Sequence, residues 1–400
     1  MKHFISALSL LLALLMLAAC GTTPPPAPDD DTTPAQTPAV TTPAASENTP
    51  AVDTQPGEET TAYPLLITGP MPEFALTQRS VVEDNVYSGY PRFNKLASPT
   101  FTVPGLDQKI VPQGMDIWPE QGWIMMSGYF SDTSVSDCSM VVAIDMTTGE
   151  IAAEYKLKNP DGTAHTGHAG GVAITKKNMF ISTGSKLLRI PLSQLCETGR
   201  MGDARIVEEI TVPVRASFCN YSGGYLWVGD FYYGKSYPTD EYRHMENRKG
   251  KMYYAWSVGY ALDESAENEI GETRWHSGME YATPDVILSI DQKIQGMAVV
   301  DDSYIALSQS YGRGNDSKVL LYQNVLSTDP HTTVTLNGTS VPLWFLDGKV
   351  EERDFDAPPM AEGFAAYNGR LYLLFESGAE KYRLDGGKNP TDRIWVMEMP

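Results

Sequence analysis

Two histidines, His165 and His168, stand three residues apart in the glycine-rich segment 165–171. Imidazole titrates near neutral pH and binds zinc, so the pair is a candidate for metal binding or acid–base chemistry. On a loop, this spacing does not force both rings onto one ion, and no glutamate intervenes as in the zinc hydrolase pattern. A structural or ligand-contacting role is the third interpretation. We take His168 as a candidate catalytic residue and His165 as a candidate ligand contact.

Three further polar residues, Gln113, Gln295 and Glu362, each precede a glycine at the same position of three similar units. An amide or acid there can satisfy strand backbone that would otherwise be unpaired, which is the structural interpretation. In the functional interpretation, Glu362 supplies the negative charge of an otherwise neutral ring. It then binds a cation or acts as an acid or base, with His168 as its partner.

A third chemical signal is the aromatic-rich segment 231–282, which carries tyrosines, histidines, arginines and tryptophans. Aromatic rings with polar tips are favoured on surfaces that are both apolar and hydrogen-bonding. The segment is therefore a candidate for glycan or peptide recognition. The alternative is a long loop that buries its own rings.

The elements that must position these residues form an internal repeat. A short phrase recurs five times, in which a small residue precedes an apolar one and then a small or short polar one. Its occurrences are Gln113–Ile117, Gly170–Ile174, Ala216–Asn220, Gln295–Val299 and Glu362–Ala366. A tight turn and an apolar strand follow each phrase, so each unit is expected to open with a β-hairpin.

Most units also contain a third strand, and the first contains a fourth at 151–157. Four antiparallel strands repeated every 50 to 80 residues or so are typical of an all-β fold, the β-propeller. We count five blades. Six stays open if residues 64–110 form a degenerate blade. The segment 100–103 is expected to close the ring as an outer strand of the last unit.

In a propeller, the first strand of each blade lines the channel and begins on the face where the second strand ends. Residues at these two places therefore converge, and they mix acids, amides, phenols, an imidazole and a guanidinium, which suits a polar ligand. Besides His165, His168 and Glu362, the candidate ligand contacts are Gln113, Tyr129, Asp230, Tyr232, Gln295, Tyr311, Arg313 and Glu376.

The repeat loosely resembles secreted propellers of the gluconolactonase, strictosidine synthase-like and NHL groups, and the phrase 361–365 resembles phytase-like esterase propellers. The resemblance rests on strand rhythm over about 290 residues. It implies an extracytoplasmic lactonase or esterase activity. The calcium ligands of these groups have no residue-by-residue match here, so no metal site is predicted and a divalent cation stays open.

The N-terminal residues predict export. Lys2 and His3 precede an apolar run too short to span a membrane, and Leu17-Ala18-Ala19-Cys20 resembles the lipobox of bacterial lipoproteins. We expect a signal peptide at 1–19, a diacylated Cys20, a disordered Thr/Pro/acid-rich linker at 20–62 and the propeller domain at 63–400. The expected location is the bacterial cell envelope, with the lipid as the contact to the membrane.

Charge excludes one class of partner. The chain has 50 acidic and 30 basic residues, a formal charge of −20. Nucleic acid binding needs clustered basic residues that neutralise phosphate, so no nucleic acid partner is expected.

No nucleophilic serine motif, phosphate-binding loop or dinucleotide fingerprint occurs in the chain. We therefore favour a non-catalytic, surface-anchored binding protein whose channel face binds a polar small molecule, a glycan or a protein. The alternative hypothesis is an extracytoplasmic hydrolase or lyase of the lactonase or esterase type, with His168 and Glu362 as base and acid. The oligomeric state stays open.

Overall fold

The computed structural model describes residues 66–85, 87–134, 136 and 138–399. The predicted signal peptide (1–19), the lipidated Cys20 and the linker (20–62) lie outside the described residues.

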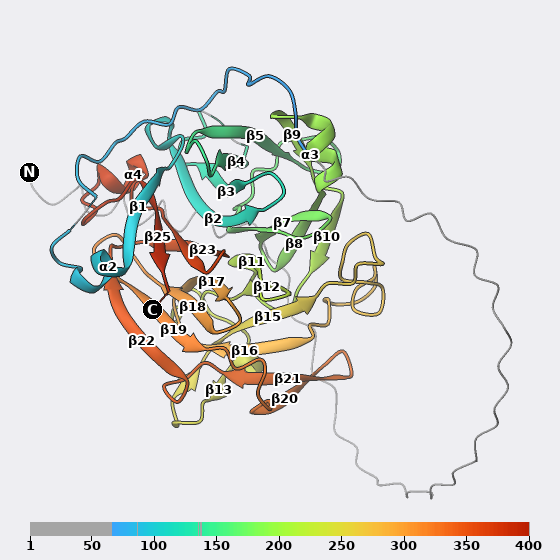
Figure 1. Ribbon diagram of the computed structural model, residues 1–400. Helices are drawn as coiled ribbons and strands as arrows, with labels where there is room; N and C mark the ends of the chain where they lie inside the picture. The colour runs from blue at the N-terminus through green and yellow to red at the C-terminus, as the bar shows by residue number, and fades with distance from the viewer. Residues whose placement is uncertain (1–65, 86, 135, 137, 400) are drawn as a thin grey trace, which may run out of the picture. The chain divides into compact units, whose positions relative to one another are not determined.

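Five sheets are arranged around a common axis, as Figure 1 shows. Each sheet contains a four-stranded antiparallel blade whose first strand lies innermost, because β2, β6, β11, β17 and β23 contact one another in a closed ring. The chain is therefore a five-bladed β-propeller. From the inner to the outer strand, the blades are β2 (Ile110–Trp118), β3 (Trp123–Phe130), β4 (Met140–Asp145) and β5 (Ile151–Lys158); β6 (Gly171–Ile174), β7 (Asn178–Thr183), β8 (Lys186–Pro191) and β10 (Glu208–Thr211); β11 (Phe218–Ser222), β12 (Tyr225–Gly229), β15 (Ala255–Ala261) and β16 (Val286–Ile290); β17 (Ile294–Val300), β18 (Tyr304–Gln309), β19 (Ser317–Gln323) and β22 (Glu351–Ala357); β23 (Ala361–Tyr367), β24 (Arg370–Phe375), β25 (Arg393–Glu398) and β1 (Ala97–Thr102).

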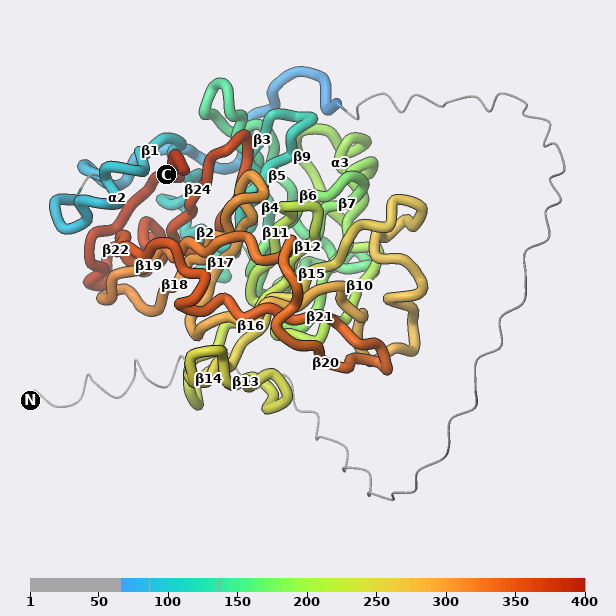
Figure 2. Tube along the Cα trace, turned by 60° about the horizontal axis from the view of Figure 1, so that its bottom comes forward, coloured from blue at the N-terminus to red at the C-terminus, as the bar shows by residue number. Residues whose placement is uncertain are grey.

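Further strands and short helices extend or flank the four-stranded blades. Strand β9 extends the first sheet in parallel to β5, and β21 extends the third sheet in parallel to β16. The short hairpin β13–β14 projects beside β16 (Figure 2). The remaining bounds are α2 (Pro91–Leu96), η2 (Leu106–Gln108), α3 (Leu192–Thr198), β9 (Met201–Arg205), η3 (Glu241–Arg243), β13 (Met245–Glu246), β14 (Met252–Tyr253), β20 (Thr332–Leu336), β21 (Thr339–Phe345) and α4 (Glu380–Arg383).

The ring closes through its first strand, because β1 pairs antiparallel with β25 as the outer strand of the fifth blade. Among the described residues of 66–96 there is no strand, so this segment forms no sixth blade. It runs outside the first blade toward the fifth (Figure 1). Glu154 on β5 accepts hydrogen bonds from the backbone of Ala75 and Leu76, and Asp392 accepts from that of Val81 and Val82.

The repeated small residues allow the inner strands to approach closely. A Cβ added to Gly114 on β2 would lie 2.3 Å from Gly171 Cα on β6, and one added to Gly171 would lie 2.3 Å from Cys219 N on β11. On β17, a Cβ on Gly296 would lie 2.4 Å from Glu362 O. The phrase that recurs in the sequence is therefore a packing feature of the channel wall.

A buried acid, Asp116, ties three inner strands together. Its carboxylate accepts backbone N–H bonds from Ile117 (2.8 Å), Ile174 (2.8 Å) and Tyr221 (3.1 Å), and a side-chain bond from Asn220 (3.2 Å). Burial raises the pKa of Asp116 to about 7, and the backbone donors oppose that rise. Asp116 thus cross-links β2, β6 and β11.

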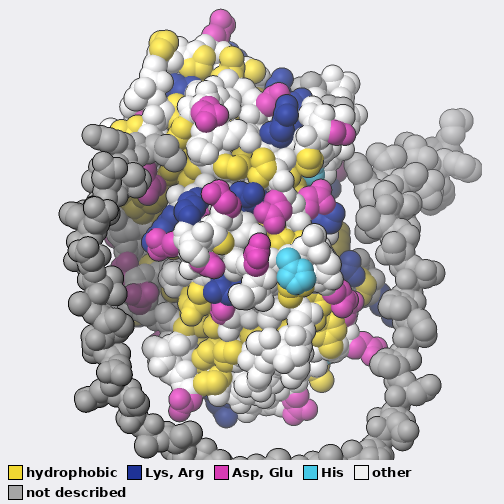
Figure 3. Space-filling model, turned by 90° about the vertical axis from the view of Figure 1, so that its right-hand side faces the viewer, with side chains coloured by type: hydrophobic (Ala, Val, Ile, Leu, Met, Phe, Trp, Pro, Cys, Tyr) yellow, Lys and Arg dark blue, Asp and Glu magenta, His cyan; other side chains and the backbone are white. Residues whose placement is uncertain are grey.

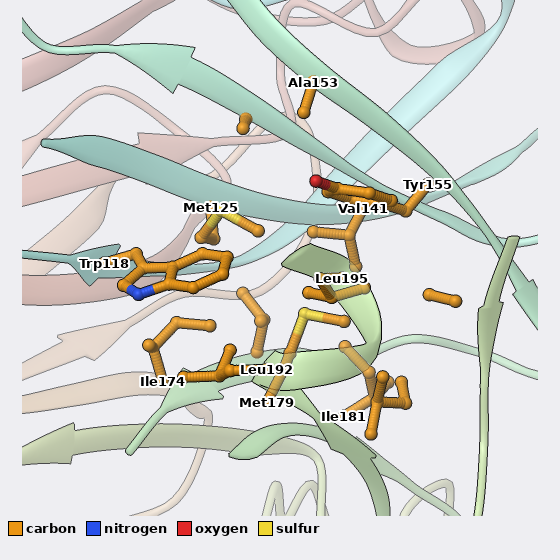
Figure 4. Packing of buried hydrophobic residues seen from close by; sticks show 14 of the residues in the cluster. Trp118, Met125, Val141, Ala153, Tyr155, Ile174, Met179, Ile181, Leu192 and Leu195 are labelled. Atoms are coloured by element: carbon orange, nitrogen blue, oxygen red, sulfur yellow. The ribbon is translucent and has the colours of Figure 1, made fainter. Parts of the chain in front are cut away.

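Apolar side chains fill the spaces between blades. Figure 4 shows the cluster between the first two blades, where Trp118 and Met125 pack with Ile174 and Met179, and α3 adds Leu195. All five side chains are buried. Their burial stabilises the angle between neighbouring blades, at roughly 1.5–3 kcal/mol for a large apolar side chain.

The aromatic-rich segment 231–282 is not one uninterrupted insertion. Strand β15 passes through it as the third strand of the third blade, pairing with β12 and β16. Two loops result, 230–254 before β15 and 262–285 after it.

The side of the domain shown in Figure 3 mixes acidic and basic side chains. Ion pairs join Lys186 to Glu209 and Arg189 to Glu208 between β8 and β10. In the described ranges, no helix has the length and hydropathy needed to cross a membrane.

Candidate functional site

Three inner strands carry a β-bulge at the same position. The pairings β2–β3, β17–β18 and β23–β24 each shift register there. The residues at these bulges are Gln113, Gln295 and Glu362, the three side chains that share a slot in the repeat. A bulge re-aims the side chain of the extra residue. Here it brings the three side chains together at one mouth of the channel, with Glu376 at the end of β24.

Two buried carboxyl groups form the floor of this mouth. Glu362 and Glu376 are 4% and 8% exposed and hydrogen-bond to each other. Gln295 Nε2 donates to Glu362 Oε1 at 2.8 Å, and Gln113 Nε2 donates to Glu376 Oε2 at 3.0 Å. The amides and acids of three inner strands therefore satisfy one another.

Burial raises the pKa of both carboxyl groups. It raises the pKa of Glu362 well above its ordinary value, and the neighbouring Glu376 raises it further. Burial also raises the pKa of Glu376, but Lys381 and the hydrogen bond from Glu362 oppose that rise. The surroundings therefore favour the protonated form of Glu362 more strongly than that of Glu376.

Lys381 lies over two tyrosines beside this pair. Its Nζ donates to Tyr129 Oη at 2.5 Å and lies 4.8 Å from the ring centroid of Tyr129 and 4.5 Å from that of Tyr382. The His168 ring is 5.2 Å from that of Tyr129. Burial lowers the pKa of His168 to about 4 and Lys381 adds to this shift, so the imidazole is neutral near pH 7.

A second group of aromatic rings comes from the segments that follow β12 and β18, in the third and fourth blades. Lys293 Nζ lies 4.7 Å from the ring centroid of Tyr233 and 5.8 Å from that of Tyr311, and these two rings are 4.1 Å apart. Phe231 links Tyr311 (6.2 Å) to Tyr237 (5.2 Å). Burial raises the pKa of Tyr129, and Glu376 and Tyr237 add to the rise, as expected if both groups share one mouth.

His165 lies apart from His168. Its Nδ1 is 3.0 Å from Asn159 Oδ1, and its buried Nε2 has no hydrogen-bond partner among the described residues. The charge that most influences its titration is Glu209, on an outer strand. The spacing of three therefore does not bring both rings to one site.

The side chains of Asp230 and Tyr232 make structural contacts with the loop 230–254 and with β15. Asp230 is fully buried, lies 3.3 Å from Arg243 Nε and accepts a hydrogen bond from Trp256 N. Tyr232 stacks on Tyr254 at 4.6 Å. These contacts fix the loop to the third blade.

Arg313 lies at the rim. It forms an ion pair with Asp385, and its guanidinium is 5.5 Å from the Tyr382 ring. Its charge is already balanced, so it contributes mainly to the shape of the rim.

In the part of the chain that the structure describes, no three His, Cys, Asp or Glu residues are grouped to hold a metal ion. Nearby acids at the rim are also paired, as Glu380 is with Lys109.

The sequence did not single out Lys293, Lys381 or Tyr382. Lys381 lies in the short helix α4, five residues after Glu376, and Lys293 lies in the turn before β17. Both segments adjoin strand ends that the repeat marks as channel-facing. The segments that flank these strand ends, and not the strand ends alone, therefore contain the signal for both lysines.

No protein-family model matches the chain, and no curated protein matches it either. Among solved structures, it is similar to the PQQ-bound aldose sugar dehydrogenase from Streptomyces coelicolor (12% identity, 76% of this chain, 97% of that chain, TM-score 0.38). It is also similar to glutaminyl cyclase from Myxococcus xanthus (10%, 76%, 92%, 0.36) and to a luciferin-regenerating enzyme (10%, 75%, 92%, 0.34). At these values the chain is assigned to no family.

Proposed function

We propose that the channel mouth binds a polar ligand without transforming it. The observation that supports this most is an aromatic rim above a buried polar floor. Tyr129, Tyr311 and Tyr233 contribute rings at the mouth, and Glu362 and Glu376 lie beneath them with their glutamine partners. Rings above hydrogen-bonding groups suit a ligand with a flat face and hydroxyl groups, such as a glycan.

The pKa shifts argue against general base catalysis. Burial favours the protonated form of Glu362, and Glu376 accepts hydrogen bonds from Glu362 and Gln113. The neutral His168 has a pKa far below neutral, which makes it a weak base at pH 7. None of the three is poised to remove a proton from a substrate.

One observation favours a second candidate function, a hydrolase or lyase. Glu362 is a neutral carboxylic acid in a buried site, the state that general acid catalysis requires. A lactone or ester whose leaving oxygen reached Glu362 would find a proton donor there.

A glycan array followed by a turnover assay tests both functions. We expect the purified protein to retain a glycan and to hydrolyse no lactone or ester, and Tyr311→Ala and His168→Ala to weaken binding by roughly tenfold. The exposed His276 supplies the matched control, His276→Ala, which should bind as wild type. Turnover that disappears in Glu362→Gln would establish the enzyme instead.

We also propose that the domain acts at the envelope surface, held by a lipid on Cys20. The support is the lipobox with its preceding apolar run. Cys20→Ala should move the protein from the membrane fraction to the soluble fraction. A variant that stays in the membrane fraction would rule out this anchor.

A further inference from the structure

Two ammonium groups at the channel mouth, those of Lys293 and Lys381, lack an ion-pair partner in the part of the chain that the structure describes. Among the described residues, no carboxylate oxygen lies within the 4.0 Å ion-pair distance of Nζ of Lys293 or Lys381. Both are held by tyrosines in a chain whose acids outnumber its bases, 50 to 30. We propose that the mouth binds an acidic carbohydrate, whose carboxylates pair with the ammonium groups of Lys293 and Lys381 and whose sugar rings stack on the tyrosines. This inference rests on the proposed ligand-binding function.

The position of Lys381 is built into the site. The Tyr129 hydroxyl accepts its hydrogen bond at 2.5 Å, and the rings of Tyr129 and Tyr382 lie on its two sides at 4.8 and 4.5 Å. Cation–π contacts hold an ammonium in place and leave its other N–H donors for a ligand. Burial lowers the pKa of Lys381, and the nearby Glu376 opposes that lowering.

Residues of the third and fourth blades hold Lys293 in place. It occupies a turn with a positive φ of 64°, which its backbone bonds to Tyr232 and Ser310 maintain. Its ammonium contacts the rings of Tyr233 and Tyr311. A lysine held in a sparsely populated conformation, with its charge directed onto ring faces, points to a binding contact.

The charge at the mouth selects an anion. Arg313 is neutralised by Asp385, and Glu380 by Lys109. Lys293 and Lys381, in contrast, have no ion-pair partner among the described residues. Charge-assisted hydrogen bonds to a carboxylate are about twice as strong as neutral ones.

The ring geometry favours a sugar over an acidic peptide. Tyr233, Tyr311 and Phe231 form a tilted stack, and Tyr129 with His168 forms another, so flat apolar faces border both lysines. A pyranose presents C–H groups on its face and hydroxyls at its edge, which matches rings with polar tips. A uronate adds the carboxylate within the same residue.

Calorimetric titration with trigalacturonate and with its methyl ester tests the inference on the full protein. The ester keeps the ring and removes the charge. We expect trigalacturonate to bind at least about tenfold more tightly than the ester, and this preference to fall as salt rises. Lys381→Met and Lys293→Met should each remove most of the preference. Lys186→Met, which removes a lysine paired with Glu209 on β8, is the matched control and should retain it.

The outcomes separate the inference from the proposed function. Equal binding of acid and ester, weakened by Tyr311→Ala, would overturn the acidic ligand and leave polar ligand binding standing. No binding of trigalacturonate by the wild type would overturn the inference as stated. Binding of a polyglutamate peptide in its place would assign the mouth to an acidic protein.

Discussion

Single residues at the two ends of the channel show how similar acids acquire different roles. Asp116 is surrounded by N–H donors from its own and two further strands, so its carboxylate is a cross-link. Glu362 is buried beside a second acid and accepts a hydrogen bond from an amide, and its pKa is raised well above its ordinary value. The surroundings of each acid, and not its residue type alone, determine its pKa.

The residues of the site could be predicted from the repeat only where strand position determines direction. Gln113, Gln295 and Glu362 share a slot and converge. Asp230 shares the strand-end position of Glu376, yet it turns inward because Arg243 from an irregular loop pairs with it. No periodicity encodes that loop, which is also why Lys293 and Lys381 were missed.

At the residue scale, Glu376→Gln should make stability less dependent on pH. In the wild type, the folded-state pKa of Glu362 is raised, so its contribution to stability is present below its ordinary value of 4.5 and is lost as pH rises through the raised value. Removing the neighbouring charge lowers that pKa. The free energy of unfolding, measured in urea at pH 5.5 and 8, should therefore fall less in the variant than in the wild type.

The exposed Glu272→Gln is the control for this comparison. Its pH dependence should match the wild type, since other titrating groups contribute equally to all three proteins. An unchanged slope in Glu376→Gln would show that the two carboxyl groups titrate independently.

At the scale of elements, the strands were predictable because turns and apolar runs mark them, and the fourth strand expected at 151–157 coincides with β5 (Ile151–Lys158). Strand β15 was not, because Ala255–Ala261 mixes small and aromatic residues within an aromatic-rich segment. Strands β9, β20 and β21 lie outside the four-strand plan, so the repeat contains no signal for them.

The close packing of the inner-strand glycines predicts that adding a side chain there destabilises the fold. Gly114→Ala places a Cβ 2.3 Å from Gly171 Cα, and backbone cannot yield as a flexible side chain can. We expect a loss of roughly 3 kcal/mol or more in the free energy of unfolding, at or above the upper end of ordinary overpacking. Chemical denaturation measures it. Gly314→Ala is the matched control, because an added Cβ there has open space and no positive φ. Equal stability of the two variants would contradict the close strand approach.

At the scale of the whole molecule, the ring depends on a clasp formed by residues far apart in sequence. Asp392, fully buried beside β25, accepts hydrogen bonds from Ser80 Oγ (2.8 Å), Val81 N (2.6 Å), Val82 N (3.0 Å) and Asn85 Nδ2 (2.9 Å). The segment that precedes β1 is thereby fixed to the last blade.

Asp392→Ala should release this clasp. Four donors lose their acceptor, so we expect the free energy of unfolding to fall by about 2–4 kcal/mol. Limited proteolysis should cut first within 80–96, ahead of any site in the blades. The exposed Asp329→Ala serves as control and should behave as wild type. Within residues 66–399, cleavage in the blades before any cut in 80–96 would mean that the segment is held by other contacts.

Strand β1, which closes the ring, also determines when the domain can finish folding. Ala97 of β1 pairs with Met397 of β25, so the contact that completes the ring joins residues 300 positions apart. The other blades are built from hairpins that form as soon as their own residues are available, whereas the fifth must wait for both ends of the domain. Until then the edge of β25 and the flank of the first blade stay open. The chain is therefore most prone to aggregate in the interval between synthesis of its fourth blade and ring closure.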